Sequence, residues 1–281
     1  MEENRPSGTA MRAALHRAAH QLLDRPPIFE DPLALRIVGD EAVKVLEADS
    51  ENQQRPMIRA LRASLAARSR YTEDALTASL ARGVGQYVVL GAGLDTFAYR
   101  NAHPSLRVFE LDHPATQAWK RERLAAAHIA VPPSLTFVPV DFEKQTLAEG
   151  LSRAGLDPAV PTFFCWLGVT TYLTKSAVMD TLRFVAERGA GTEIVCDFLV
   201  TRESLQGREC AMFDRLAEVV ASTGEPFLTL LEPAEFERET RALGFGQVDV
   251  VGPSVLAPRY FAGRIDGLHV TGLSRLLQAR V

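Results

Sequence analysis

Two glycines and one carboxylate form the part of this sequence with the clearest chemical potential. Gly91, Ala92 and Gly93 follow the apolar run Tyr87–Leu90, and Asp112 ends the next apolar run, 21 residues after Gly91. Glycines let the backbone approach a ligand and adopt φ values closed to other residues. An acid at the tip of the neighbouring strand can accept hydrogen bonds from both hydroxyls of a ribose. The pattern therefore predicts a cofactor that carries a nucleoside.

The residues around this turn favour a cofactor without phosphates. Thr96 stands where the dinucleotide fingerprint has its third glycine, and the sequence contains no phosphate-cradling loop that ends in Gly-Lys-Ser or Gly-Lys-Thr. S-adenosyl-L-methionine instead needs a cation for its carboxylate, an acid for its ribose and a polar group for its adenine. Arg68 and Arg70 precede the first strand, and Asp141 follows the third. All three requirements are therefore met in chain order.

The elements that must position these residues alternate between short apolar strands and helices from residue 86 onward. Such runs are typical of a parallel sheet covered by helices on both faces. They predict an α/β fold with a doubly wound, mostly parallel sheet. The expected strands are Tyr87–Leu90, Arg107–Leu111, Thr136–Val140, Thr162–Leu167, Glu193–Phe198, Gln247–Val251 and Leu276–Val281, and the expected helices are Thr9–Leu23, Pro114–Ala127, Ser176–Arg188, Glu203–Thr223 and Pro233–Gly244.

The same pattern divides the chain into three parts of a single domain, residues 1–281. Residues 1–82 predict an N-terminal helical cap, residues 83–198 the cofactor-binding core, and residues 199–281 a substrate-cap insertion with the last strands. A chain of this length can bury a large core as one such domain.

Composition narrows the range of partners. The net charge of −4 argues against a dedicated nucleic-acid surface, and no apolar run approaches the roughly 20 residues of a membrane-spanning helix. Cys165, Cys196 and Cys210 are odd in number, which fits reduced thiols better than a disulfide framework or a metal site. With no secretory signal at the N-terminus, we expect a cytoplasmic protein without a metal, nucleic-acid or membrane partner. A homodimer stays open.

Longer runs of residues resemble the leucine carboxyl methyltransferase family of S-adenosyl-L-methionine-dependent enzymes, especially its bacterial branch, which includes polyketide carboxyl O-methyltransferases. The resemblance implies a class I methyltransferase fold, Rossmann-like, with S-adenosyl-L-methionine as the cofactor and a small-molecule acceptor. The shared motifs are Thr9-Ala-x-x-Ala-Ala-x-x-Arg17-Ala, Asp31-Pro32, Ala67-Arg68, Leu90-Gly-Ala-Gly-Leu-Asp-Thr96, Glu110-Leu-Asp-His-Pro114, Val140-Asp141-Phe142 and Gly168-Val-Thr-Thr-Tyr-Leu173.

The resemblance also implies roles for single residues of the first half of the site. Arg68 would bind the methionyl carboxylate, with Arg17 as a candidate second contact. Gly91 would approach the cofactor along its backbone, and Asp112 would hold the ribose.

The second half of the site follows the third and fourth strands. Asp141 and Phe142 would frame the adenine, because an acid accepts from the adenine amine while a ring packs on its face. Many relatives carry glutamate near the amino group of the cofactor where this chain has Leu167, so that contact must come from the backbone or elsewhere. The run up to Tyr172 ends the fourth strand, where the transferred methyl group would point.

Several of these residues have a structural alternative. Asp112 can cap the helix that starts at Pro114, although the spacing from the glycine turn favours ribose binding. His113 is a weak candidate for a general base, and its place beside Pro114 favours a structural role. Tyr172 either lies over the substrate or covers the sheet.

Other arginines have routine interpretations. Arg70 and Asp74 are spaced for a surface pair at i and i+4. Arg55, Arg59 and Arg62 share one helix face, which we interpret as a solvated face.

Methyl transfer from a sulfonium depends on alignment and on exclusion of water. A carboxylate is already ionised at neutral pH, whereas a phenol or alcohol generally needs a base. The sequence contains no Ser-His-Asp, His-Glu-x-x-His or Cys-x-x-Cys constellation. We therefore predict O-methylation of a small molecule, such as a polyketide or another secondary metabolite, on a carboxylate first and a hydroxyl second.

The acceptor is expected under a cap made by the N-terminal helices and residues 200–235. Phe213, Phe227 and Leu228 are candidate lining residues, although a place in the core is slightly favoured for them. The alternative functions are a protein carboxyl methyltransferase and a nucleotide-dependent oxidoreductase. Thr96 and Arg68 argue against the oxidoreductase.

Overall fold

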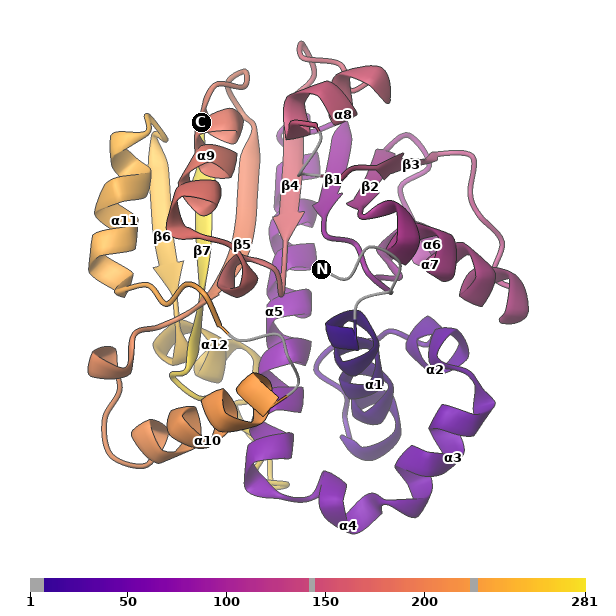
Figure 1. Ribbon diagram of the computed structural model, residues 1–281, viewed down its shortest axis with the longest axis vertical. Helices are drawn as coiled ribbons and strands as arrows, with labels where there is room; N and C mark the ends of the chain where they lie inside the picture. Colours follow the sequence, from indigo (N-terminus) through magenta and orange to yellow (C-terminus); the bar gives the residue numbers. More distant parts are fainter. Residues whose placement is uncertain (1–7, 142–144, 223–226) are drawn as a thin grey trace.

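A computed structural model describes residues 8–141, 145–222 and 227–281, and its central feature is a seven-stranded sheet (Figure 1). The strand order is β3-β2-β1-β4-β5-β7-β6. Strands β1 to β5 pair in parallel, whereas β7 runs antiparallel to β5 and β6. The strands are β1 (Gln86–Leu90), β2 (Arg107–Asp112), β3 (Leu135–Pro139), β4 (Thr162–Trp166), β5 (Glu193–Leu199), β6 (Gln247–Val251) and β7 (Ser274–Arg280).

The predicted α/β fold is confirmed, and every expected strand is present with its ends shifted by at most two residues. The sheet grows from β1 in two directions, toward β2 and β3 on one side and toward β4 and β5 on the other. Ligands of open α/β sheets bind at the carboxyl ends of the strands where the strand order reverses in this way. Gly91 follows β1 and Leu167 follows β4, so the candidate residues gather at this switch point.

Helices cover both faces of the sheet, and α1 to α4 lie beyond the carboxyl ends of the parallel strands (Figure 1). Short 3₁₀ turns follow β4 (η1, Thr170–Tyr172) and β5 (η2, Arg202–Ser204). The α-helices are α1 (Gly8–Leu23), α2 (Leu33–Val38), α3 (Asp40–Ala48), α4 (Ser50–Gln53), α5 (Pro56–Leu80), α6 (Phe97–Arg100), α7 (Pro114–Ala126), α8 (Leu147–Arg153), α9 (Lys175–Ala186), α10 (Arg208–Ser222), α11 (Pro233–Ala242) and α12 (Pro253–Tyr260).

Three apolar clusters hold these layers together. One packs α5, α6 and α12 against one face of the sheet, and a second packs α8, α9, α10 and α11 against the other. The third joins α1, α2 and α3 to Leu94, which lies within the glycine turn, residues 91–96. Burial of a leucine side chain contributes roughly 1.5–3 kcal/mol. The N-terminal helices thus pack directly on the glycine turn, which is expected to bind the cofactor.

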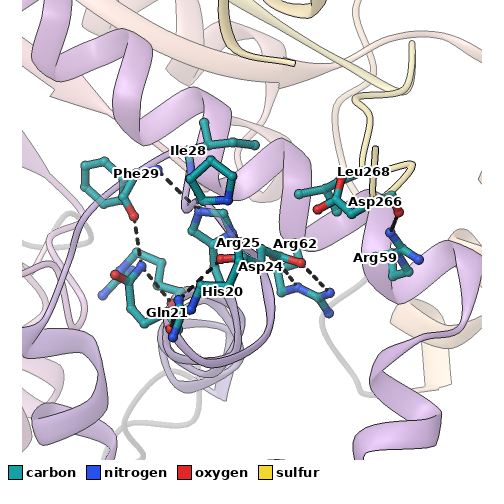
Figure 2. A network of polar contacts seen from close by, with 12 residues as sticks. His20, Gln21, Asp24, Arg25, Ile28, Phe29, Arg59, Arg62, Asp266 and Leu268 are labelled. Carbon is teal, nitrogen blue, oxygen red and sulfur yellow. Dashed lines mark hydrogen bonds and ion pairs between the residues drawn. The ribbon is translucent and has the colours of Figure 1, made fainter. Parts of the chain in front are cut away.

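The solvated-face interpretation of Arg55, Arg59 and Arg62 is wrong for Arg62. Arg59 donates to the carbonyl of Asp266, but Arg62 is 1% exposed and pairs with Asp24 at 2.8 and 3.0 Å (Figure 2). Helical spacing predicts which residues share one face of α5. It cannot predict that the end of α1 packs over that face. An unpaired charge would be costly there, so Asp24 is the partner that allows burial.

No helix within the described ranges is long and apolar enough to cross a membrane.

Candidate functional site

The glycine turn after β1 is built so that only glycine fits at its start. Gly91 has a φ of +70°, and a Cβ atom there would lie 2.5 Å from Cγ2 of Val169, in the loop after β4. The Ala92 nitrogen donates to the Leu111 carbonyl at 2.9 Å, which ties the turn to the end of β2. Gly93 also has a positive φ, and a Cβ atom there would lie 2.9 Å from Cβ of Ala10 in α1. The turn therefore lies between the end of β4 and helix α1.

Asp112 is joined directly to this turn. Its Oδ2 accepts from the Gly93 nitrogen at 2.6 Å, and its Oδ1 accepts from the His113 nitrogen at 2.7 Å. Burial raises the pKa of Asp112, while these two backbone hydrogen bonds oppose that rise. Each carboxylate oxygen retains further acceptor capacity for a ligand hydroxyl.

The helix cap next to Asp112 is provided by another side chain. The His113 Nδ1 accepts from the Ala115 nitrogen at 3.3 Å at the start of α7. The structure therefore shows that His113, and not Asp112, is the side chain that caps α7.

Arg68 lies across the switch point from Asp112, on α5. Its guanidinium pairs with Asp197 at the end of β5, and a Cβ atom on Gly168 would lie 3.0 Å from its Nη2. The other oxygen of Asp197 accepts from the Gly168 nitrogen at 2.6 Å. These contacts fix the guanidinium against the end of β4. Asp197 was missed in the sequence, where it lies within the apolar run of a buried strand.

The remaining predicted cofactor residues follow β3 and β4. Asp141 is partly buried, and the Val140 nitrogen beside it donates to the Asp112 carbonyl at 2.9 Å, so the ends of β2 and β3 meet. Leu167 is partly buried and packs against the core cluster on the α5 face. Phe142 lies outside the described residues.

Tyr172 lies beside the segment expected to cap the acceptor. Its ring centroid is 6.2 Å from that of Phe227, and the Leu228 nitrogen donates to the Thr171 carbonyl at 2.8 Å. Of the three candidate lining residues, Phe213 is buried in the core, whereas Leu228 is 62% exposed. The loop after β4 and residues 227–229 are thus joined through the backbone.

A small cavity opens beside the Arg68–Asp197 pair, at the ends of β5 and β7. Its polar lining combines two guanidinium groups with three hydroxyls, and Leu256, Val270 and Leu276 supply apolar walls. The polar lining residues are Arg68, Arg275, Ser64, Thr271, Ser274 and Asp197.

His16 on α1 is a further titratable group near Arg68. Burial lowers its pKa to about 4, and the nearby charges of Arg62, Arg68 and Arg12 act in the same direction. Its imidazole is therefore neutral at neutral pH. No motif marks it, because it is a single histidine in an alanine-rich helix.

The thiols and carboxylates do not form a metal cluster within the part of the chain that the structure describes. Cys165 and Cys196 are buried and free, and Cys210 is partly buried and free. Burial raises the pKa of the Cys165 and Cys196 thiols.

Comparisons with known proteins show the family of this chain. The family model described as leucine carboxyl methyltransferase matches residues 10–186. A Bacillus subtilis protein named as an S-adenosyl-L-methionine-dependent methyltransferase, YktD, is 31% identical over 297 positions, which cover 95% of each chain. A Parafrankia protein named in the same way is 34% identical and covers 97% of this chain and 83% of its own.

Solved structures give the same fold. A methyltransferase structure from Thermobifida fusca superposes with a TM-score of 0.58 at 19% identity, covering 95% of this chain and 93% of its own. A DUF574 family protein from Streptomyces avermitilis gives a TM-score of 0.57 at 18% identity, covering 94% of this chain and 96% of its own. The fold is therefore that of class I methyltransferases, and the chain belongs to the leucine carboxyl methyltransferase family of S-adenosyl-L-methionine-dependent methyltransferases.

Proposed function

We propose that this methyltransferase transfers its methyl group to an oxygen of a small molecule, to a carboxylate first and to a hydroxyl second, with a polyketide or another secondary metabolite as the acceptor class. The observation that carries the proposal is the arrangement at the switch point. There a glycine turn bonded to Asp112 faces Arg68, whose guanidinium is fixed by Asp197. The cytoplasmic location and the homodimer remain predictions.

The residues present fit S-adenosyl-L-methionine. Gly91 has a positive φ and no Cβ atom, which lets Val169 pack against the turn and shapes the end of β1 for a ligand. Asp112 would accept from the ribose hydroxyls, and Arg68 would be the cation for the methionyl carboxylate. Asp141 would accept from the adenine amine, and the backbone at Leu167 would contact the amino group. The proposed packing of Phe142 on the adenine lies outside the described residues.

The bound cofactor supplies an electrophilic methyl group and needs no metal to do so. The work of the chain is to hold donor and acceptor in line and to keep water out, which together account for much of the rate in reactions of this type. Asp197 contributes by holding Arg68, and η1 with residues 227–229 contributes by closing the acceptor side.

A carboxylate acceptor suits a site in which the candidate bases Asp197 and His113 bind other groups. Asp197, the carboxylate among the lining residues, is engaged by Arg68 and the Gly168 nitrogen, and His113 is engaged as a helix cap. An acceptor that arrives already ionised requires no base from this set.

The proposal is tested with methyl-labelled S-adenosyl-L-methionine and matched pairs of aromatic or polyketide-like acids and phenols. Methyl esters release labelled methanol in alkali, whereas methyl ethers keep the label. We expect alkali-labile label on a small acid. Alkali-stable label would identify a hydroxyl acceptor, and label that precipitates with added protein would identify a protein carboxyl methyltransferase. Binding of NAD without binding of S-adenosylhomocysteine would overturn the cofactor site itself.

A further inference from the structure

Asp31 is a fully buried carboxylate that touches the far side of the glycine turn. Its Oδ1 accepts from the hydroxyl of Thr96 at 2.7 Å, and its Oδ2 pairs with Nε of Arg17 at 3.1 Å. Thr96, which ends the turn, is itself only 1% exposed. The sequence pattern presents Asp31 as a helix cap before Pro32, and it does accept from the Ala34 nitrogen at 3.2 Å. That bond uses only part of its acceptor capacity.

Arg17 binds both Asp31 and the backbone of the turn. Its Nη2 donates to the Leu94 carbonyl at 2.6 Å while its Nε remains on Asp31. The guanidinium is thus directed at a protein carbonyl and a protein carboxylate, which differs from its expected place on the cofactor carboxylate. The turn is held from two sides: Asp112 binds the Gly93 nitrogen, and the Asp31–Arg17 pair binds Leu94 and Thr96.

Residues 24–29, which precede Asp31, are fixed to α1 and α5 by polar contacts (Figure 2). The His20 Nε2 accepts from the Ile28 nitrogen at 2.9 Å, so the proton lies on Nδ1, which is 2.7 Å from Asp24. Gln21 donates to the Phe29 carbonyl at 2.9 Å and accepts from the Asp31 nitrogen at 3.0 Å. Asp24 in turn pairs with Arg62 of α5. The loop before Asp31 is therefore hydrogen-bonded to α1, and Asp24 at its start is paired with α5.

We propose that Asp31 is a positioning residue for the cofactor site, acting through Thr96 and Arg17 to preset the glycine turn. The N-terminal segment is then part of the cofactor-binding wall as well as a cap over the acceptor. The inference builds on the cofactor site proposed above. It extends that site to residues that do not touch the cofactor.

The Thr96 hydroxyl provides the cleanest test, because valine has nearly the shape of threonine but can neither donate to Asp31 nor accept from Arg100, whose Nε lies 3.3 Å from the hydroxyl. Thr96→Val is expected to weaken binding of S-adenosylhomocysteine, measured by calorimetry, by about 5- to 10-fold, since a hydrogen bond to an ionised group is lost. Thr96→Ser keeps the hydroxyl and is expected to retain the wild-type Kd. Asp31→Asn removes the charge that both Thr96 and Arg17 contact and is expected to lose at least 10-fold.

A matched control separates positioning from general loss of stability. Ser79 is also fully buried, and its hydroxyl donates to Glu193 at 2.6 Å, at the amino end of β5 and so at the opposite ends of the parallel strands from the glycine turn. Ser79→Ala is expected to lower Tm much as Thr96→Val does while leaving the Kd unchanged. All titrations are made well below the Tm of each variant.

The outcomes distinguish this inference from the cofactor site on which it rests. Wild-type affinity in folded Thr96→Val overturns the role of Asp31, provided that Asp112→Ala still abolishes or weakens binding. Equal losses in Thr96→Val and Ser79→Ala also overturn it. If Asp31→Asn fails to fold, the comparison of Thr96→Val with Thr96→Ser tests the role of Asp31 by itself. If the wild type itself does not bind S-adenosylhomocysteine, the proposed cofactor site is rejected, together with the role of Asp31.

Discussion

Asp197 pairs with Arg68 and at the same time accepts a hydrogen bond from the Gly168 nitrogen at 2.6 Å. The two side chains are 12% and 19% exposed, so the pair is shielded from much of the screening that weakens surface ion pairs. One carboxylate thereby links α5 to the ends of β4 and β5.

The first prediction concerns this link. Asp197→Asn should weaken binding of S-adenosylhomocysteine about 10-fold, equivalent to roughly 1.4 kcal/mol, because Arg68 loses the charge that orients it. Binding of methylthioadenosine, which has no amino-acid carboxylate, should be unchanged. Calorimetry with both ligands measures the difference. Arg70→Met is the control, because Arg70 is half exposed and pairs with Asp74 instead. Equal losses for the two ligands would contradict a role through Arg68.

The second prediction concerns the ribose. Asp112→Ala should lower the affinity for S-adenosylhomocysteine about 10-fold or more, since the ribose hydroxyls lose their acceptor and Gly93 loses its partner. His113→Ala removes only the cap on α7 and should cost about 1 kcal/mol of unfolding free energy with unchanged affinity. Unfolding in urea and calorimetry separate the two effects. Unchanged affinity in a folded Asp112 variant would remove this residue from the site.

A third prediction uses the shape of the glycine turn. Gly91→Ala places a methyl group 2.5 Å from Val169 at a φ of +70°, so it should reduce both unfolding free energy and cofactor affinity, the latter by about 10-fold or more. Gly244→Ala, at a φ of +102° with open space around it, isolates the backbone strain of about 1–2 kcal/mol and should leave the affinity unchanged.

A second substitution checks the cause of that loss. Val169→Ala in the Gly91→Ala background removes the clashing methyl group and should restore part of the stability. If the double variant is no more stable than Gly91→Ala alone, the contact with Val169 is not the reason for glycine at this position.

The sheet and the glycine turn could be predicted because local chemistry determines them. The apolar runs are short and alternate with helical segments, and the residues that follow β1 and β2 lie together once the strands are parallel and adjacent. Asp112 and Gly93 are therefore brought into contact by register alone. Helix α12 was not predicted, because Pro258 within it interrupts the helical pattern.

The support around the site could not be predicted, because it depends on which faces become buried. Asp197 lies in an apolar run, and Arg62 lies on what the spacing presents as a surface face; each takes its role from a partner far away in sequence. Asp31 shows the same limit. Its local signal as a helix cap is correct in part, and its bond to Thr96, 65 residues away, leaves no trace in either segment.

The last prediction concerns the pH dependence of stability. The pKa of His16 falls from 6.5 to about 4 on folding, chiefly through burial. Between those values the unfolded chain binds the proton and the folded chain does not, so this residue makes the protein less stable as the pH falls from 6.5 to 4. The loss is at most about 3.5 kcal/mol, because one pKa unit corresponds to about 1.4 kcal/mol.

His16→Gln removes the titrating group, so the difference in unfolding free energy between variant and wild type isolates its contribution. Burial raises the pKa of Glu110, which acts in the opposite direction, but Glu110 is present in both proteins and cancels in the comparison. Urea unfolding from pH 7 to pH 4 should show a steeper loss in the wild type. A histidine ring signal in NMR that disappears in the variant should titrate near pH 4, and a midpoint near 6.5 would show that His16 is solvated.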